Sequence, residues 1–260
     1  MDHASVWALF DRDMRQDARP DGPGSRIEHD GRVVRQIGGE GGWDGVLWSD
    51  LDELGAEGAI EAQLRYFAGL GRRFEWKLYG HDTPHDLGKR LRAAGFSPEP
   101  EETLMVAEVA EVADLDLDVP VPEGVELRPV TDPLGVGLVV DVHERAFGTD
   151  GSRLRRQLLA LLDTDPEAAV AVVALADGVP VSSARMELPP GARFAGLWGG
   201  GTVEEWRGRG LYRALVAHRA RVAADRGYRY LQVDAMPTSR PILERLGFAP
   251  LTTTTPYVSP

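Results

Sequence analysis

Apolar and polar positions alternate with two different periods along the second half of the chain. Apolar residues recur every three to four positions over 133–147, 152–162 and 211–225, which predicts amphipathic helices. Shorter apolar runs bounded by turn residues predict strands over 125–130, 169–175, 179–188, 194–203, 228–235 and 252–258. A short helix is expected over 239–246, with Ser239 as its cap. This order predicts an α/β fold of the α+β type, in which a mixed sheet carries helices on both faces.

The first half has a weaker pattern that ends in the same way as the second. Its elements are expected at 6–18 (helix), 32–37 and 45–48 (strands), 56–70 (helix), 74–79 (strand), 85–94 (helix) and 103–109 (strand). The helix end Leu91–Phe96 matches the end Leu243–Phe248, and a strand follows each at the same distance. A helix that closes on glycine and an apolar residue is also a common C-cap. The matched distance favours an internal duplication.

A change of composition marks the boundary between the halves. The acidic alternation that starts at Asp114 gives way to Pro120, Pro122 and Gly124 before a new apolar run begins at Val125. Proline and glycine at this spacing interrupt regular structure. We therefore expect an N-terminal domain over 1–118, a linker over 119–124 and a C-terminal domain over 125–260.

Composition narrows the classes of function. The net charge of -12 is expected to repel nucleic acid and anionic membranes, because phosphate contacts dominate such binding, whereas it tolerates a cationic amine. The absence of cysteine excludes disulfides, thiolate metal sites and cysteine nucleophiles. The N-terminus has no signal-peptide pattern, and the longest apolar run, 168–176, is too short to span a membrane. We expect a soluble, cytoplasmic protein.

The stretch that carries most chemical information runs from a strand through glycines into the long helix at 211–225. Gly208 and Gly210 let backbone amides turn toward a ligand, and the helix N-terminus adds a partial positive charge. The combination predicts a site for a phosphate or diphosphate. No lysine follows the glycines as in a P-loop, and Arg213 stands where a dinucleotide fingerprint needs its third glycine.

The loop Arg207–Tyr212 resembles the Arg/Gln-x-x-Gly-x-Gly/Ala loop of the GNAT acyltransferase superfamily, with Tyr212 in place of the usual small residue. The resemblance covers 125–260 and includes the Gly-Phe ending at Phe248. It implies a GNAT fold in two tandem units, acetyl-CoA as acyl donor, and a bulge in the strand before the loop. The cofactor-binding residues that it implies are Gly200, Gly201, Thr202, Arg207, Gly208, Arg209, Gly210, Leu211, Tyr212 and Ser239.

The first half resembles a degenerate copy of the same unit. The acidic run Ser49–Glu53 precedes its helix, so carboxylates are expected to fill that helix end and no CoA is expected to bind there. Only one strand fits after Gly247, where the superfamily usually has two. We therefore expect the N-terminal half to cover or complete the open sheet edge of the C-terminal half.

The resemblance implies direct attack of an amine on the thioester. Leu243 stands where the family often has a tyrosine acid, so Tyr257, Tyr212, Ser239 or water is expected to protonate the leaving thiolate. For the base, Asp234 at a strand end is the first candidate, followed by Glu187 and Glu204. Two of these carboxylates also have a structural interpretation: Asp234 as a helix-capping or turn residue, and Glu204 as a solvated residue or the partner of an arginine.

The histidines are interpreted as structural, and no metal site is expected. His143 and His218 lie on predicted helices, and the segment His81–His85 lacks a third ligand at a suitable spacing.

The leading hypothesis is an N-acetyltransferase that acts on the primary amine of a small molecule or on an N-terminal amine, as a monomer or homodimer. The alternative is a non-catalytic acyl-CoA-binding or regulatory protein, which the missing tyrosine favours. A structural module with a vestigial loop fits the N-terminal half better than the whole chain.

Overall fold

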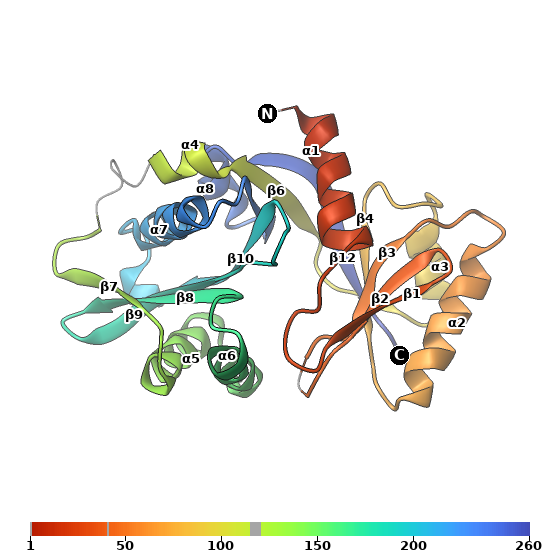
Figure 1. The fold of residues 1–260 in the computed structure, drawn as a ribbon, viewed down its shortest axis with the longest axis horizontal. Helices are drawn as coiled ribbons and strands as arrows, with labels where there is room; N and C mark the ends of the chain where they lie inside the picture. The colour runs from red at the N-terminus through yellow and green to blue at the C-terminus, as the bar shows by residue number, and fades with distance from the viewer. Residues whose placement is uncertain (1, 41, 115–120) are drawn as a thin grey trace. The chain divides into compact units, whose positions relative to one another are not determined.

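The computed structural model describes residues 2–40, 42–114 and 121–260 and confirms an α/β fold (Figure 1). The chain divides into two compact units. Unit 1 comprises 1–104, 234–240 and 250–260, and unit 2 comprises 105–233 and 241–249. Among the described residues, no helix has the length and apolar character needed to cross a membrane.

Unit 1 is built on a sheet of strands from the N-terminal part of the chain, which the last strand of the chain joins. Its helices are α1 (His3–Phe10), which continues as a π-helix over Asp11–Gln16, α2 (Ala56–Gly69) and α3 (Leu87–Ala93). Its strands are β1 (Arg26–Asp30), β2 (Val33–Ile37), β3 (Gly45–Ser49), β4 (Glu75–Tyr79), β5 (Ser97–Pro98) and the part of β12 (Ala249–Val258) from residue 250 onward. They follow the order β1-β2-β3-β4-β12, with β5 beside β12. A core centred on Phe67, Trp76 and Leu91 joins the sheet to α2 and α3.

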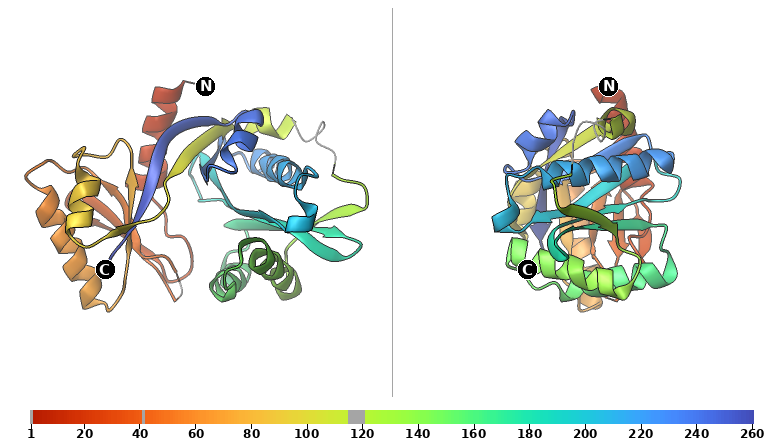
Figure 2. Two further views of the ribbon diagram at one scale, coloured as in Figure 1. Left: turned by 180° about the vertical axis from the view of Figure 1, so that it is seen from behind. Right: turned by 90° about the vertical axis from the view of Figure 1, so that its left-hand side faces the viewer.

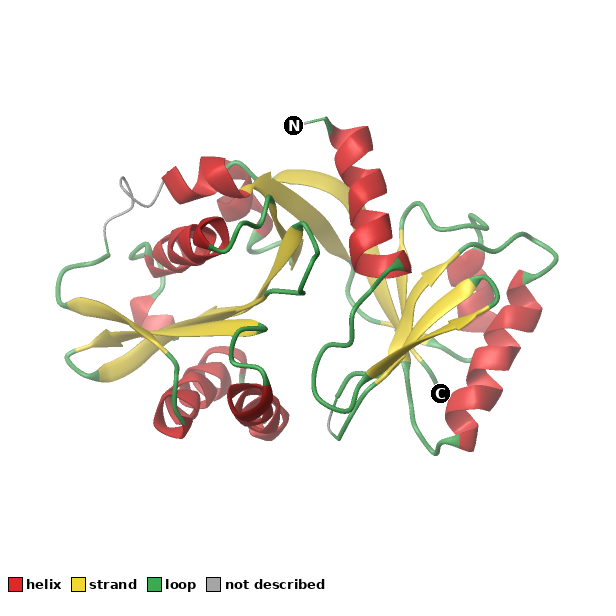
Figure 3. Ribbon diagram, in the orientation of Figure 1, coloured by secondary structure: helices red, strands yellow, loops and turns green. Residues whose placement is uncertain are grey.

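Unit 2 is a mixed sheet with helices on both faces, as the sequence predicts (Figures 2 and 3). Its strands are β6 (Glu102–Glu108, from residue 105), β7 (Val125–Pro129), β8 (Ala169–Ala176), β9 (Val179–Glu187), β10 (Phe194–Thr202) and β11 (Tyr230–Ala235, to residue 233). Its helices are α4 (Val109–Asp114), α5 (Pro133–Phe147), α6 (Ser152–Thr164), α7 (Leu211–Asp225) and α8 (Arg240–Arg245, from residue 241). The strand order is β6-β11-β10-β9-β8-β7, with α5 and α6 on one face and α7 on the other.

The two units repeat one sequence of elements, which supports the duplication inferred from the matched helix ends. An antiparallel pair with an irregular register, β2–β3 or β9–β10, comes first. A helix, α2 or α7, then leads to a parallel strand, β4 or β11. The next helix, α3 or α8, ends in the same hydrogen-bond pattern at a left-handed glycine, Gly95 (φ 94°) or Gly247 (φ 87°).

Each unit contains a strand from the other half of the sequence. β6 precedes the predicted linker, yet its residues from 105 onward extend the sheet of unit 2 beyond β11. The sequence predicts an open sheet edge in the C-terminal half, because only one strand follows Gly247. β6, from the N-terminal half, lies at that edge. β12 in turn pairs antiparallel with β4, from Thr254 opposite Tyr79 to Val258 opposite Glu75.

The compact units therefore differ from the domains 1–118 and 125–260, because β6 and β12 each contact the other half's sheet. Those domain boundaries remain a prediction, and residues 119 and 120 of the predicted linker lie outside the described residues.

Most predicted elements are present, several within one residue of the predicted ends. The structure adds β1, β5 and α4, whose short or polar sequences carry little periodicity. The predicted cap Ser239 behaves differently, because its hydroxyl donates to the Met236 carbonyl at 3.1 Å. A hydroxyl used in this way stabilises the turn before α8 and does not cap the helix.

Candidate functional site

In unit 2 the parallel strands β10 and β11 pair over a short stretch and then stop pairing. The register runs from Phe194 opposite Tyr230 to Gly196 opposite Gln232, whereas β10 continues to Thr202. Both strands are central in the sheet, where backbone groups normally hydrogen-bond to neighbouring strands. The remainder of β10 therefore has its β11 side available for a ligand that offers backbone-like hydrogen bonds.

A bulge in β10 begins directly beyond this point. Trp198 lies opposite Arg185 and Gly201 opposite Ser183, so Gly199 and Gly200 together face one residue of β9. Two residues opposite one is the definition of a bulge, and this one confirms the bulge that the resemblance implies. Gly199 has a φ of 56°, which glycine adopts more easily than any other residue.

Side chains close against the bulge glycines from both faces of the sheet. A Cβ atom on Gly200 would lie 2.8 Å from the Tyr212 ring on the α7 side. A Cβ on Gly201 would lie 2.7 Å from the Phe147 ring at the end of α5. These contacts explain why the sequence has glycine at both positions.

A buried arginine of α7 holds the start of the bulge in place. Arg219 is only 1% exposed and donates to the Arg185 carbonyl at 2.7 Å, with a longer contact of 3.5 Å to the Trp198 carbonyl. These carbonyls belong to the last residue pair in register before the bulge. Burial lowers the pKa of Arg219 to about 10, so the guanidinium is still charged at neutral pH.

The glycine loop leads from β10 into the N-terminus of α7. Gly208 (φ 74°) and Gly210 (φ 87°) have left-handed backbones, and open space lies where a Gly208 side chain would project. Within the described part of the chain no side chain caps α7, whose 15 residues begin at Leu211 without an acidic residue in the first turn. The first amide donors of such a helix and its partial positive charge form an anion site. The diphosphate site that the sequence predicts here stays a prediction, and this backbone geometry is compatible with it.

The loop arginines have contacts that the sequence did not predict. The Arg207 amide donates to the Glu204 carbonyl at 3.2 Å, so the available amides begin at Gly208. The Arg207 guanidinium donates to the carbonyls of Thr202 and Ala146. These two hydrogen bonds join the end of β10 to α5. Arg209 lies 4.5 Å above the Trp206 ring. Arg207 thus braces the loop, and Arg209 is the better placed of the two for a phosphate.

Thr202 is held at the end of the bulge by a buried serine. The Ser182 hydroxyl lies 2.8 Å from both the Gly201 carbonyl and the Thr202 hydroxyl. Ser182 is fully buried, so these contacts fix the backbone between the bulge and the loop.

The candidate bases of unit 2 have different surroundings. Glu187 is half-buried and lies opposite Gly196, where β10 and β11 stop pairing. Glu204 is exposed, in a short 3-10 helix before the loop. The position of Glu187 fits a proton acceptor better, because burial and proximity to the ligand favour that role.

Asp234, the first candidate base, is grouped with unit 1, where it forms a buried ion pair with Lys77. Burial lowers the pKa of Lys77, but the charge of Asp234 raises it and holds this pKa above its ordinary value. The Asp234 carboxylate already has an ion-pair partner in the Lys77 ammonium, so this contact weighs against Asp234 as the base.

Tyr257 and Ser239 also belong to unit 1. Tyr257 is 3% exposed and packs in the core of that unit, opposite Trp76 in the β4–β12 pair. Its burial in this core weighs against a role as the acid. The remaining predicted site residues, from Glu187 to Tyr212, lie together in unit 2.

The counterpart of the loop in unit 1 is closed by a carboxylate. Asp52 accepts hydrogen bonds from the amides of Leu54 and Gly55 at 3.1 and 2.7 Å, directly before α2. Arg32 forms ion pairs with Asp50 and Asp52. A protein carboxylate thus occupies the start of α2, as the acidic sequence predicts.

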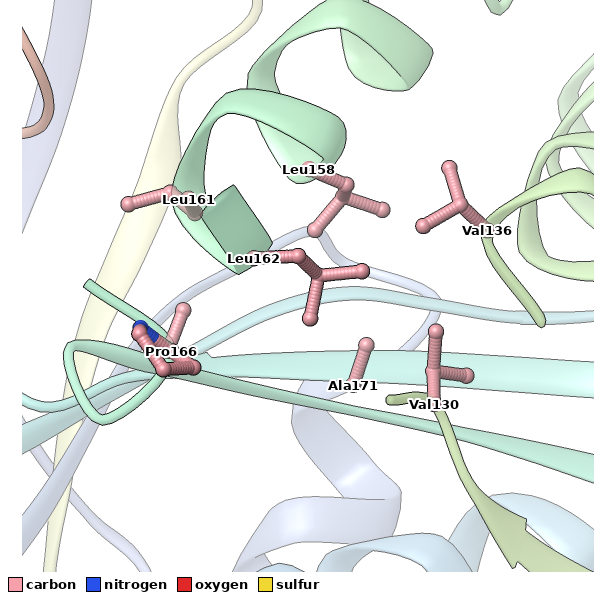
Figure 4. Close-up of a pocket in the computed structure, with 8 residues that line it drawn as sticks. Val130, Val136, Leu158, Leu161, Leu162, Pro166 and Ala171 are labelled. Atoms are coloured by element: carbon pink, nitrogen blue, oxygen red, sulfur yellow. The ribbon is translucent and has the colours of Figure 1, made fainter. Parts of the chain in front are cut away.

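Two other places offer little chemistry. In the ranges that the structure describes, no group of three histidine or acidic side chains is placed to hold a metal. A pocket between α5, α6 and β8 is lined by apolar residues alone, among them Val136, Leu158 and Leu162 (Figure 4). It has no polar group to orient a substrate.

Sequence reasoning missed Arg219 and Arg185. Arg219 follows Leu215 by four positions and therefore lies on the apolar face of the predicted helix. A charged residue on that face could have indicated a buried arginine. Arg185 occupies the middle of a predicted strand, and nothing in its local sequence indicates that the bulge lies beside it.

The comparisons with known proteins agree with this geometry. The acetyltransferase (GNAT) family matches residues 138–248. A GCN5-related N-acetyltransferase from Kribbella flavida has a similar fold, with a TM-score of 0.68, 21% identity and coverage of 99% of this chain and 94% of that one. A functionally unknown conserved protein from Staphylococcus epidermidis gives a TM-score of 0.69 at 16% identity, covering 94% and 96%.

A tandem GNAT protein from the clavulanic acid biosynthesis pathway gives a TM-score of 0.65 at 16% identity, covering 94% of this chain and 85% of that one. No curated protein matches the sequence. The predicted GNAT fold in tandem units is confirmed by these likenesses.

Replacement of Tyr257 tests its structural role. Tyr257→Ala is expected to lower the free energy of unfolding by about 3 kcal/mol, because it leaves a cavity in the core of unit 1. Tyr257→Phe keeps the ring and is expected to change acetyl transfer by less than about twofold, whereas loss of a general acid costs about a hundredfold or more. Denaturant unfolding and initial rates of thiol release measure the two effects, and a hundredfold loss in the phenylalanine variant would restore Tyr257 as the acid.

Glu102 is expected to make the stability of unit 1 depend on pH. Burial, and then the charge of Asp234, raise the pKa of Glu102 from 4.5 to about 7. The folded state then binds the proton more tightly, so this contribution is full below pH 4.5 and is lost as the pH rises through 7. Glu102→Gln should flatten the decline in unfolding free energy over this window, while the exposed neighbour Glu101→Gln should leave it unchanged. Equal curves for both variants would contradict the assignment.

Proposed function

We propose an N-acetyltransferase activity for this protein, since its residues 138–248 match the acetyltransferase (GNAT) family. The donor is acetyl-CoA, and the acceptor is a primary amine. The observation that carries the proposal is the uncapped N-terminus of α7 behind two left-handed glycines, at the end of a strand that has stopped pairing with its neighbour.

The residues of unit 2 fit the parts of such a donor. The amides of Gly208 to Tyr212 and the Arg209 side chain would hold the diphosphate. The backbone of Gly200 to Thr202 would meet the pantetheine arm and the thioester carbonyl. Bound acetyl-CoA would supply an activated acyl carbon: the amine nitrogen, after losing a proton, would bond to it, the carbon–sulfur bond would break, and the sulfur would leave as a thiolate that then takes a proton from water.

Proton removal from the acceptor ammonium needs a proton-accepting group near the reacting centre. Glu187 is the carboxylate that we propose for this step, directly or through water, because it lies where β10 and β11 separate. His143 on α5 is a second acceptor in the same unit. Burial, and then the charge of Arg185, lower its pKa, which keeps the ring neutral near pH 7.

The proposal includes no side-chain acid for the leaving thiolate. Leu243, at the position where the family often has a tyrosine, is fully buried. A CoA thiolate is a good leaving group, and water can protonate it. A non-catalytic acyl-CoA-binding protein is the alternative that this replacement favours.

Substitution in the glycine loop tests donor binding. Gly208→Glu is expected to weaken acetyl-CoA binding at least about a hundredfold, because a carboxylate at a helix N-terminus repels the diphosphate. Gly227→Glu is the matched control: Gly227 follows α7, has a φ of 80° and faces open space, as Gly208 does. Isothermal titration calorimetry with acetyl-CoA gives both affinities. Equal affinities in the two variants would contradict the site.

Glu187→Gln tests the base and separates an enzyme from a binding protein. It is expected to lower kcat about a hundredfold at neutral pH and to leave acetyl-CoA affinity unchanged. Glu204→Gln, an exposed carboxylate, should retain kcat. Thiol release with a panel of primary amines measures both. If wild-type protein binds acetyl-CoA and releases thiol with no amine, the binding-protein alternative is correct.

A further inference from the structure

Arg185 lies on β9 beside the first glycine of the bulge. The preceding residue, Ala184, packs with Val172 and Leu215 on the α7 face. Because side chains alternate along a strand, Arg185 projects to the α5 face. A Cβ atom on Gly199 would lie 3.5 Å from Arg185 Nε, so the arginine side chain lies across the bulge.

No residue that the structure describes neutralises the guanidinium of Arg185. Its Nε is buried without a hydrogen bond, and no carboxylate of the described residues pairs with it. The chain has 41 acidic and 29 basic residues, so carboxylates are plentiful. A buried donor or charge without a partner destabilises the folded protein. Such an arrangement is typical of a group whose partner is a ligand.

A neutral ring, two carboxylates and an aromatic ring are the other groups near Arg185. His143 is kept neutral by burial and by Arg185 itself, while Glu144 opposes this shift from the same helix. Glu187 lies two residues along β9 on the same face. Phe147 packs against Gly201 and is 49% exposed, so an apolar ring borders the polar groups.

The diphosphate of the donor is not the anion that we expect Arg185 to bind. The proposed diphosphate amides start at Gly208, and the segment Thr202–Arg207 separates them from the bulge. Arg185 lies at the opposite end of the bulge, beside Gly199. The anion at this end therefore belongs to the other reactant.

We propose that Arg185 binds a carboxylate carried by the acceptor amine, which makes the acceptor a free amino acid. This inference rests on the proposed acetyl transfer. The planar guanidinium donates two parallel N–H bonds, from Nε and one Nη, to the two oxygens of a carboxylate. A peptide N-terminus presents a neutral amide in place of that carboxylate and is discriminated against.

The test compares free amino acids with their α-carboxamides, which have nearly the same shape but lack the charge. Binding to the full-length protein saturated with CoA is measured by calorimetry, independently of turnover, and thiol release from acetyl-CoA gives KM and kcat. The variants are Arg185→Ala, Arg185→Lys and the control Arg145→Ala. Arg145 is an α5 arginine that already pairs with Asp141.

The wild-type protein and the Arg145→Ala control should bind at least one free acid about tenfold or more tightly than its amide, as expected for a charge-assisted pair. Arg185→Ala should abolish this preference through a higher KM, and Arg185→Lys should restore part of it. The inference is overturned if amides bind as tightly as acids, if no free acid binds, or if Arg185→Ala lowers kcat equally for both. The last result would assign Arg185 to the thioester oxygen. Loss of acetyl-CoA binding or of all thiol release would instead overturn the proposed function.

Discussion

The early end of the pairing between β10 and β11 is the constraint on which unit 2 depends. Two central parallel strands that pair only from Phe194 to Gly196 present backbone groups to a ligand instead of to each other. The bulge at Gly199 and Gly200 shifts the register by one residue, and β10 continues to pair with β9 beyond it. Arg219 donates to the Arg185 carbonyl, and the Ser182 hydroxyl donates to the Gly201 carbonyl. These hydrogen bonds hold the backbone around the bulge in position.

The rest of the site depends on the loop that follows the end of β10. The strand leads to Gly208 and Gly210, whose left-handed backbones bring the amides before α7 to the surface without a capping side chain. In unit 1 the same order of elements ends differently, because Asp52 accepts hydrogen bonds from the amides before α2. One candidate anion site thus remains from a duplicated plan, and in the other copy a carboxylate of the chain accepts from the amides before α2.

The sequence could predict the fold and the loop because both rest on local patterns. Periodicity located α5 and α7, and the glycines with Arg207 indicated the anion site. The chemistry of Asp234 and Tyr257 was not predictable in this way, because their partners come from distant parts of the chain. Lys77 neutralises Asp234, and the core around Trp76 takes up Tyr257. The exchange of β6 and β12 between units likewise depends on long-range pairing.

The most direct test of the account is a crystal structure with acetyl-CoA bound. We predict the diphosphate on the amides between Gly208 and Tyr212, the pantetheine arm along Gly200 to Thr202, and no ligand before α2, where Asp52 remains in place. A diphosphate bound elsewhere, with β10 and β11 paired beyond Gly196, would contradict the central claim.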